Sequence, residues 1–260
     1  MLITGSSDGL GRAVARHAHA QGWAVLAHGR DEAKLAAVAE ELPGTRTLRA
    51  DLACLRTVER LAGEVLASTD RLDALVCNAG VGTRIPPHRG ESVDGIELRF
   101  AVNYLAGYAL VRRLLGLLRE SAPARIVYVA SAGQMRLDFS DVMLDDGGYS
   151  GIRAYCQSKL AQIMLAFDLG EELAGTGVTA TALHPGTLMP TRMVVDAGIA
   201  PVDSLESGVE AVWNLVADPA LEGVTGRYFD RMGEAEPDAQ AHDRAARAAL
   251  RELSRELTGV

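Results

Sequence analysis

A glycine-rich turn near the start of the chain places the strongest constraint on its fold. A short apolar run, residues 2–4, leads directly into Gly5-Ser6-Ser7-Asp8-Gly9-Leu10-Gly11, and a helical pattern follows over residues 12–21. Glycines between a strand and a helix let the backbone turn tightly and approach a diphosphate at the helix N-terminus. The spacing GxxxGxG departs from GxGxxG, and a loop without a ligand is the plain alternative. Its place at the first strand-helix junction favours a nucleotide-binding turn.

The rest of the chain alternates between strand and helix patterns. Further strands are predicted at residues 23–28, 45–50, 72–77, 125–130, 178–183 and 227–229. This alternation predicts an α/β protein, a single-domain Rossmann fold with a doubly wound parallel sheet of about seven strands and helices on both faces. Within one domain, 1–260, we expect residues 188–201 to form a mobile lid and residues 238–257 an amphipathic C-terminal helix.

Composition excludes several classes of protein. The chain has 260 residues, a net charge of -8 and scattered basic residues, which argues against a nucleic-acid partner. No apolar run reaches the ~18 residues that span a bilayer, and only a few residues precede the glycine turn, which leaves no room for a signal peptide. We therefore expect a soluble, cytoplasmic protein with no membrane partner. The cysteines and histidines lack ligand spacing, so we predict neither a metal site nor a disulfide framework.

Tyr155 and Lys159 form a candidate acid-base pair. If this stretch is helical, the two residues lie one turn apart on the same face. An ammonium ~4 Å from the phenol, at an effective dielectric constant of ~20, would bring the tyrosine pKa close to neutrality, although burial opposes this. Of 26 basic residues only Lys34 and Lys159 are lysines, which indicates that position 159 requires a compact charge. Such a pair also arises by chance on a solvated helix, so alone it is a weak motif.

Other candidates follow the predicted strands. Arg30, after strand 23–28, favours a cofactor with a 2′-phosphate, whereas Asp31 could accept a free 2′-hydroxyl but more readily caps the next helix. Ser131 follows strand 125–130, where it could be a binding group or an ordinary turn serine. Asn103 lies within a predicted long helix, residues 96–119, where a polar residue usually faces solvent.

Together these residues resemble the short-chain dehydrogenase/reductase family over nearly the whole chain. The matching motifs, in family order, are Thr4-Gly5-x-x-x-Gly9-x-Gly11, Asp51-Leu52, Asn78-Ala79-Gly80, Asn103, Ser131, Tyr155-x-x-x-Lys159 and Pro185-Gly186-Thr187. A closer similarity to the retinol-dehydrogenase-like branch rests on the wide gap between Ser131 and Tyr155, and on the segments Asn103-Tyr104-Leu105-Ala106-Gly107, Leu183-His184-Pro185-Gly186 and Gly226-Arg227-Tyr228-Phe229.

The resemblance implies an NADP(H)-dependent oxidoreductase that transfers a hydride between nicotinamide and a carbonyl or secondary alcohol. Tyr155 would be the general acid and base, Ser131 would hydrogen-bond the carbonyl oxygen, and Lys159 would lower the tyrosine pKa and hold the nicotinamide ribose. Asn103 would help to hold a water that passes protons to the lysine. The implied cofactor-binding residues are Gly5, Ser6, Ser7, Gly9, Leu10, Gly11, Arg30, Asp51, Leu52, Asn78, Ala79, Gly80, Tyr155, Lys159, Pro185, Gly186 and Thr187.

Some features depart from the family pattern or leave alternatives open. Cys77 stands where many members carry asparagine, little precedes the first strand, and no hydrophobic anchor is present, so a retinoid substrate is not implied. A non-catalytic dinucleotide-sensing protein and a nucleotide-sugar epimerase or dehydratase are the alternative functions. By analogy, pairing through the two long helices would give a homodimer or homotetramer.

A substrate rim is expected at residues 81–95, with Pro86 and Pro87. An apolar substrate pocket is suggested by Met135, Leu137, Phe139, Met143, Met189, Met193 and Val194.

Overall fold

A mostly parallel sheet organises the molecule. The computed structural model describes residues 1–83, 88–196 and 198–260, and its sheet has eight strands in the order β3-β2-β1-β4-β5-β6-β7-β8. Among the strands of the described ranges, only β8 runs antiparallel to its neighbour. The predicted α/β Rossmann fold is confirmed, with one short strand more than expected. The strands are β1 Leu2–Ile3, β2 Leu26–Gly29, β3 Arg46–Arg49, β4 Ala74–Cys77, β5 Ala124–Val129, β6 Val178–His184, β7 Arg227–Asp230 and β8 Gly233–Glu234.

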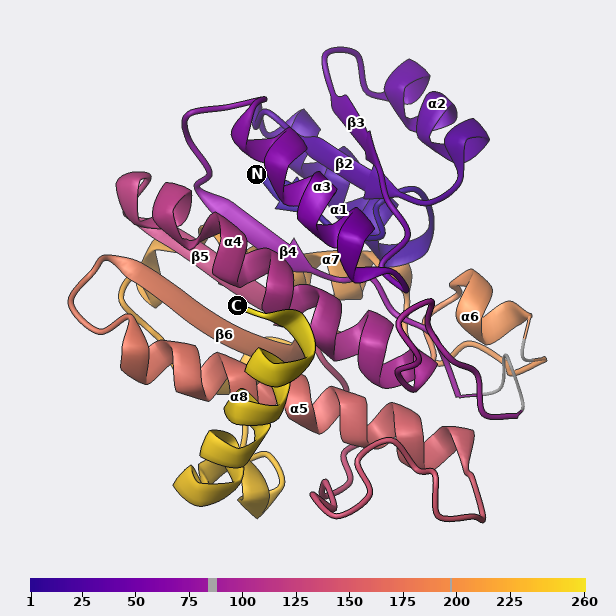
Figure 1. Cartoon of the computed structure of the whole chain (residues 1–260). Coiled ribbons are helices and arrows are strands. Elements are labelled where there is room, and N and C mark those ends of the chain that lie inside the picture. The colour runs from indigo at the N-terminus through magenta and orange to yellow at the C-terminus, as the bar shows by residue number, and fades with distance from the viewer. Residues whose placement is uncertain (84–87, 197) are drawn as a thin grey trace.

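Helices cover both faces of the sheet (Figure 1). Leu75 and Val76 of β4 point to opposite faces, because side chains alternate along a strand, and they belong to separate hydrophobic clusters. The cluster around Leu75 includes residues of α3, α4, α5 and α8, and the cluster around Val76 includes residues of α1 and α7. The helices are α1 Gly9–Ala20, α2 Glu32–Glu41, α3 Leu55–Leu66, α4 Ala106–Glu120, α5 Gly151–Glu172, α6 Arg192–Val195, α7 Leu205–Ala217 and α8 Arg244–Thr258.

The strand order creates a crevice at the centre of the sheet. β1 pairs with β2 on one side and with β4 on the other, so the direction in which the chain winds reverses at β1. Ligands of open α/β sheets bind outside the carboxyl ends of the strands at such a point. The glycine turn follows β1 and Asn78 follows β4, so both lie at this crevice.

Four segments differ from the sequence-based expectations. The helix expected at 238–257 begins later, at Arg244, and a short 3-10 helix, Ala239–His242, precedes it. The long helix begins with a π-helical segment, η1 Phe100–Leu105, before α4 continues it, and the expected lid contains the short helix α6. The expected strand at 23–28 starts later, at Leu26. Pro86 and Pro87 of the expected rim lie outside the described residues. Within the described ranges, no helix is both long and apolar enough to cross a membrane.

Candidate active site

Close packing between the glycine turn and the end of β4 explains why glycines are required. Gly5 has a φ of +67°, and a Cβ there would lie 2.8 Å from the Cα of Ala79. A Cβ on Gly11 would lie 2.4 Å from Asn78 Nδ2 and equally close to the Gly5 carbonyl oxygen. Side chains at these positions would collide with backbone or with a fixed amide, so only glycine allows this turn.

Asn78 and Thr4 hold the turn in place. Asn78 Nδ2 donates to the carbonyl oxygens of Thr4, at 2.9 Å, and Gly5, at 3.3 Å. Thr4 Oγ1 accepts from the backbone amides of Asn78 and Ala79 at 3.0 and 3.1 Å. The Asn78 side chain, which the family resemblance implied to be cofactor-binding, therefore anchors the glycine turn to β4 through its amide nitrogen.

His28 is a residue of this site that sequence reasoning missed. Its Nδ1 accepts from the Gly5 amide at 3.1 Å, and its Nε2 lies 3.2 Å from the Ala50 carbonyl oxygen, so Nε2 carries the proton. Burial lowers the pKa of His28 to about 4, which keeps the ring neutral. A histidine as the penultimate residue of a buried strand, beside a glycine turn, is the signal that could have identified it.

The start of α1 fits an anion. The Gly9 amide donates to Asp8 Oδ1 at 2.8 Å, but within the described residues the amides of Leu10 and Gly11 have no hydrogen-bond partner. Unpaired amides at a helix N-terminus bind phosphate well. The Asp8 carboxylate also pairs with Lys34 of α2, so Lys34, the other lysine besides Lys159, has a structural role. These residues therefore fit the diphosphate of a dinucleotide.

The end of β2 carries the residues expected at the adenosine. Asp31 caps α2 by accepting from the Lys34 amide at 3.1 Å, which confirms its reading as a cap. Arg30 is exposed, and its carbonyl oxygen accepts from Arg49 Nε at 3.3 Å, so the two arginines lie close together. Beyond β3, Asp51 is exposed and accepts from the Ala53 amide at 3.0 Å, while Leu52 is buried.

Ser131, Tyr155 and Lys159 converge at the carboxyl end of β5. A Cβ on Gly133 would lie 3.5 Å from Ser131 Oγ and 4.0 Å from Tyr155 Cε1, so both side chains border this glycine. Burial raises the pKa of Tyr155, and a hydrogen bond with Ser131 acts in the opposite direction. This arrangement leaves a phenol with a hydroxyl partner, which is suited to donate a proton.

Lys159 lies beside the Tyr155 ring, on the helix face that the one-turn spacing predicted. Its Nζ lies over the face of the Tyr155 ring, 5.6 Å from the centroid, and donates to Val129 O at 2.8 Å and Gln162 Oε1 at 3.0 Å. Burial lowers the pKa of Lys159 to about 7. The lysine thus donates two hydrogen bonds to protein oxygens and can lose its proton near neutral pH.

Asn103 is buried, with 2% of its surface exposed, so the expectation that it faces solvent was wrong. Its Oδ1 accepts from the Val81 amide at 2.6 Å, and its Nδ2 donates to Val81 O at 3.2 Å and Ser158 Oγ at 2.9 Å. The wider turn of the π-helix, η1, carries this residue. Such π-helical turns are frequent at functional sites. A Cβ on Gly80 would lie 3.3 Å from Asn103 Oδ1 and 3.7 Å from Lys159 Nζ, so both side chains reach the same glycine.

The segment after β6 lies over the crevice. The Thr187 amide donates to Asp203 Oδ2 at 2.6 Å, and its hydroxyl lies 3.1 Å from His184 Nε2. Further along, a Cβ on Gly9 would lie 3.3 Å from Thr191, and one on Gly82 would lie 2.6 Å from Met193. The lid therefore rests on the glycine turn and on the segment after β4, across the site expected for the cofactor.

The residues proposed for an apolar pocket divide into three groups by exposure, of which Met143 alone is partly buried. Leu137, Met189 and Val194 are buried in the protein interior. The exposed fractions of Met135, Phe139 and Met193 are 44%, 37% and 42%, so these three can contact a substrate. A separate hollow of about 260 Å³ lies at the other end of α5, and it includes none of the residues proposed for catalysis or cofactor binding.

Comparison with known proteins decides the family. The family model described as short chain dehydrogenase matches residues 1–200. The chain belongs to the short-chain dehydrogenase family. Among curated relatives, retinol dehydrogenase 13 of Mus musculus is 33% identical over 285 residues, covering 100% of this chain and 84% of the relative. Retinol dehydrogenase 14 of Homo sapiens is 33% identical over 295 residues, covering 100% and 86%.

Solved structures of the family agree with the fold. An uncharacterised protein from Mycobacterium paratuberculosis has a TM-score of 0.81 at 28% identity, covering 100% of this chain and 92% of that one. RhlG of Pseudomonas aeruginosa, solved with NADP at its active site, has a TM-score of 0.72 at 26% identity, covering 88% and 93%. Membership of the family makes this chain an NAD(P)-dependent oxidoreductase.

Proposed function

We propose that this short-chain dehydrogenase uses NADP(H) to interconvert a carbonyl and a secondary alcohol, with Tyr155 as the general acid and base. The observation that carries the proposal is the convergence of three groups on one point. The Tyr155 phenol and the Ser131 hydroxyl both border Gly133, and Lys159 is buried beneath the Tyr155 ring. A bound nicotinamide supplies or accepts the hydride.

Each side chain has a distinct task in this proposal. During reduction, Tyr155 donates its proton to the developing alkoxide, while Ser131 orients the same oxygen through a hydrogen bond. The ammonium of Lys159, near the ring, favours the phenolate that remains. Asn103 holds the Val81 backbone and Ser158 in place beside these groups, and a water held there could relay protons to Lys159.

The proposed preference for NADP(H) rests on Arg30. This exposed guanidinium follows β2, where an arginine suits a 2′-phosphate, and it lies near Arg49, whose own charge is paired with Glu32 at 3.0 Å. The carboxylate that could instead accept a free 2′-hydroxyl, Asp31, is engaged as a helix cap. Solved relatives bind NADP, which supports the same choice.

The proposed substrate is an apolar carbonyl compound. Met135, Phe139 and Met193 expose apolar surface on the segments that follow β5 and β6. Relatives named retinol dehydrogenases support an apolar substrate class.

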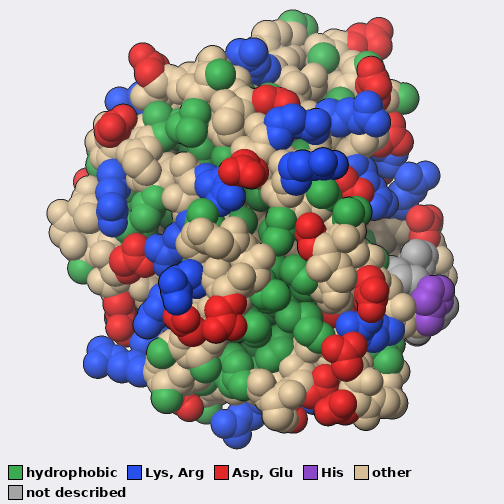
Figure 2. Space-filling view, in the orientation of Figure 1, with side chains coloured by type: hydrophobic (Ala, Val, Ile, Leu, Met, Phe, Trp, Pro, Cys, Tyr) green, Lys and Arg blue, Asp and Glu red, His purple; other side chains and the backbone are tan. Residues whose placement is uncertain are grey.

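We also propose that the protein associates with itself. Hydrophobic side chains gather over α4 and α5 beside α8 (Figure 2), and a second copy could cover them. Sedimentation of the purified protein tests this.

The deciding experiment compares the purified protein with Tyr155→Phe and Arg30→Ala. Wild-type protein is expected to reduce apolar ketones and aldehydes with NADPH. Tyr155→Phe should lose turnover by about 10²- to 10⁴-fold while still binding NADPH. Arg30→Ala should lose the preference for NADPH over NADH in fluorescence titrations. An active Tyr155→Phe enzyme would refute the mechanism, and cofactor binding without turnover of any carbonyl would instead indicate a dinucleotide-sensing protein.

A further inference from the structure

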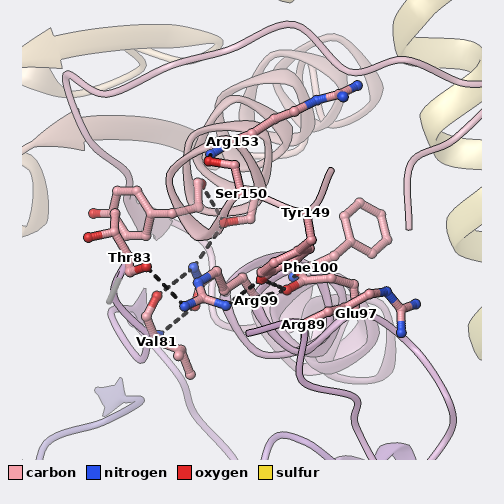
Figure 3. A network of polar contacts seen from close by, with 12 residues as sticks. Val81, Thr83, Arg89, Glu97, Arg99, Phe100, Tyr149, Ser150 and Arg153 are labelled. Carbon is pink, nitrogen blue, oxygen red and sulfur yellow. Dashed lines mark hydrogen bonds and ion pairs between the residues drawn. The ribbon is translucent and has the colours of Figure 1, made fainter. Parts of the chain in front are cut away.

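A buried ion pair lies beside the proposed active site. Arg99 and Glu97 are 0% and 1% exposed, and Arg99 Nη1 lies 3.6 Å from Glu97 Oε1. The Tyr149 hydroxyl joins them, because it donates to Glu97 Oε1 at 2.8 Å and accepts from Arg99 Nη1. We call these three residues the Arg99 cluster (Figure 3). Removing two charges from water is costly unless hydrogen bonds satisfy them, so a buried pair of this kind is weak evidence for stability alone.

Arg99 also binds backbone on the opposite side from Tyr149. Its Nε donates to Gly82 O at 2.8 Å, and its Nη2 donates to Thr83 O at 3.2 Å. Both acceptors belong to the segment that follows β4, whereas Tyr149 directly precedes α5. Gly151 begins α5, and a Cβ there would lie 2.3 Å from Thr83 O and 3.1 Å from Arg99 Nη2. The guanidinium thus fastens the segment after β4 tightly to the start of α5.

Asn103 makes a parallel connection one turn further along the same helix. It holds Val81 through both backbone groups, at 2.6 and 3.2 Å, and reaches Ser158 of α5 at 2.9 Å. Ser158 Oγ in turn donates to the Tyr155 carbonyl oxygen at 2.7 Å. Residues 81–83 are therefore held at three consecutive positions, and α5 is held on both sides of Tyr155.

We propose that Arg99 is a positioning residue for the hydride-transfer site. By fixing residues 81–83 against the start of α5, it sets the position of Tyr155 relative to Ser131 and Asn103. A planar fork suits this task, since it reaches two carbonyls and the Tyr149 hydroxyl together, which a lysine ammonium on a flexible stem would not. Burial and the contact with Glu97 raise the pKa of Tyr149 to about 12, so its hydroxyl keeps the proton that it donates. The proposal rests on the proposed function, because it assigns Arg99 to that same site.

Arg89 provides a matched control for Arg99. Its Nε donates to Met143 O at 3.0 Å and its Nη2 lies 2.7 Å from Asp145, so it also joins the segment after β4 to the one before α5. Its side chain is 20% exposed, and its contacts lie further from Tyr155 along the chain. A general loosening of these segments would therefore affect both arginine variants, whereas loss of positioning would affect only Arg99.

The test measures kcat and KM for Arg99→Lys, Tyr149→Phe and Arg89→Lys at a temperature where all are folded. Arg99→Lys is expected to lower kcat by about 10- to 100-fold with the KM for NADPH unchanged, because small misplacements of reacting groups cost that much. Tyr149→Phe should lower kcat several-fold. This variant keeps the ion pair between Arg99 and Glu97, so it still tests the proposal if Arg99→Lys does not fold. Arg89→Lys should keep the wild-type kcat and the wild-type KM for NADPH. Equal losses in the two arginine variants, or an unchanged kcat in Arg99→Lys and Tyr149→Phe, would overturn the proposal.

A second measurement does not depend on turnover. In Arg99→Lys, amide hydrogen exchange should accelerate at residues 81–83 and 149–158. Tyr149→Phe should show a weaker acceleration in the same ranges. Exchange in the strands of the sheet should not change in either variant. Unaltered exchange in both variants overturns the positioning role, even if the wild-type enzyme is inactive. Wild-type protein that reduces no carbonyl refutes the proposed function separately, so the two failures can be distinguished.

Discussion

Lys159 is the residue whose protonation most directly affects the proposed chemistry. Burial lowers its pKa to about 7, so the ammonium that supports Tyr155 is lost as the pH rises through that value. We expect kcat/KM for carbonyl reduction to fall on the alkaline side of pH ~7. Lys159→Arg stays protonated throughout, so this limb should disappear while the overall rate falls, since a planar fork fits the compact site poorly. Rate profiles of both proteins check this, and an identical limb in both would assign it to another group.

His28 makes folding stability depend on pH. Its folded pKa of about 4 lies below its ordinary value of 6.5, so the unfolded chain binds the proton more readily. Stability is therefore complete above pH 6.5 and is lost as the pH falls from there toward 4, by up to about 3 kcal/mol. His28→Asn keeps an acceptor for the Gly5 amide but cannot titrate. Denaturant unfolding at pH 7 and pH 5 should give a smaller difference for this variant than for the wild type. An equal difference would mean that other groups cause the pH dependence.

Single residues were predictable where local spacing decides their position. The separation of Tyr155 and Lys159 by one helical turn correctly predicted a shared face, and the position of Asp31 correctly predicted a cap. The contacts of Lys159 with Val129 and of His28 with Ala50 come from strands distant in the sequence. No local pattern contains such contacts, which explains why the position of the ammonium and the role of His28 were not foreseen.

At the scale of elements, the lid is held at its base by one carboxylate. Asp203 Oδ2 accepts from the Thr187 amide and from Arg231 Nη2, each at 2.6 Å, and backbone hydrogen bonds join Thr187 with Asp203 and Leu188 with Val202. Asp203→Asn loses the charge that strengthens both side-chain contacts. We expect NADPH to bind several-fold more weakly in a fluorescence titration, with little change in melting temperature. A large drop in melting temperature with unchanged binding would instead assign Asp203 to the stability of the fold.

Element types were easier to predict than irregular helices. Apolar runs and periodicity located all the long helices and seven of the strands, because burial on a sheet imposes a repeat that the sequence must carry. The π-helix, η1, has no such signature, because its apolar residues read as part of the following α4. Its wider turn is what places Asn103 inside the protein, so the error about that residue follows from the error about its helix.

At the scale of the whole molecule, the C-terminal helix α8 crosses the two long helices of one face (Figure 1). Arg251 pairs with Asp168 of α5 at 2.6 Å, and the Tyr108 hydroxyl of α4 donates to Val260 O at 2.9 Å. Amphipathic spacing predicted the helix, but not the surface that it covers. Part of the face through which association was expected is thus occupied by the chain itself, and Figure 2 shows hydrophobic side chains exposed beside α8.

A buried hydrogen bond between two hydroxyls joins α8 to the π-helical segment η1, and its loss should lower the free energy of unfolding. The oxygens of Tyr104 and Ser254 lie 2.6 Å apart, and Ser254 Oγ also donates to Leu250 O at 2.7 Å, so Tyr104 is the donor in the pair. Ser254→Ala leaves the buried phenol without an acceptor, which costs about 1–3 kcal/mol. Tyr104→Phe removes the donor while Ser254 keeps its bond to Leu250, so its cost should be smaller, about 1 kcal/mol.

Denaturant unfolding of both single variants and of the double variant separates these contributions. Because Tyr104→Phe removes the group that Ser254→Ala leaves unpaired, the double variant should be destabilised by less than the sum of the two single changes. Strict additivity would show that the two hydroxyls do not interact in solution. Losses near zero in both single variants would show that α8 does not pack on the η1 segment at Tyr104, and that the face of the long helices is open to a partner along its length.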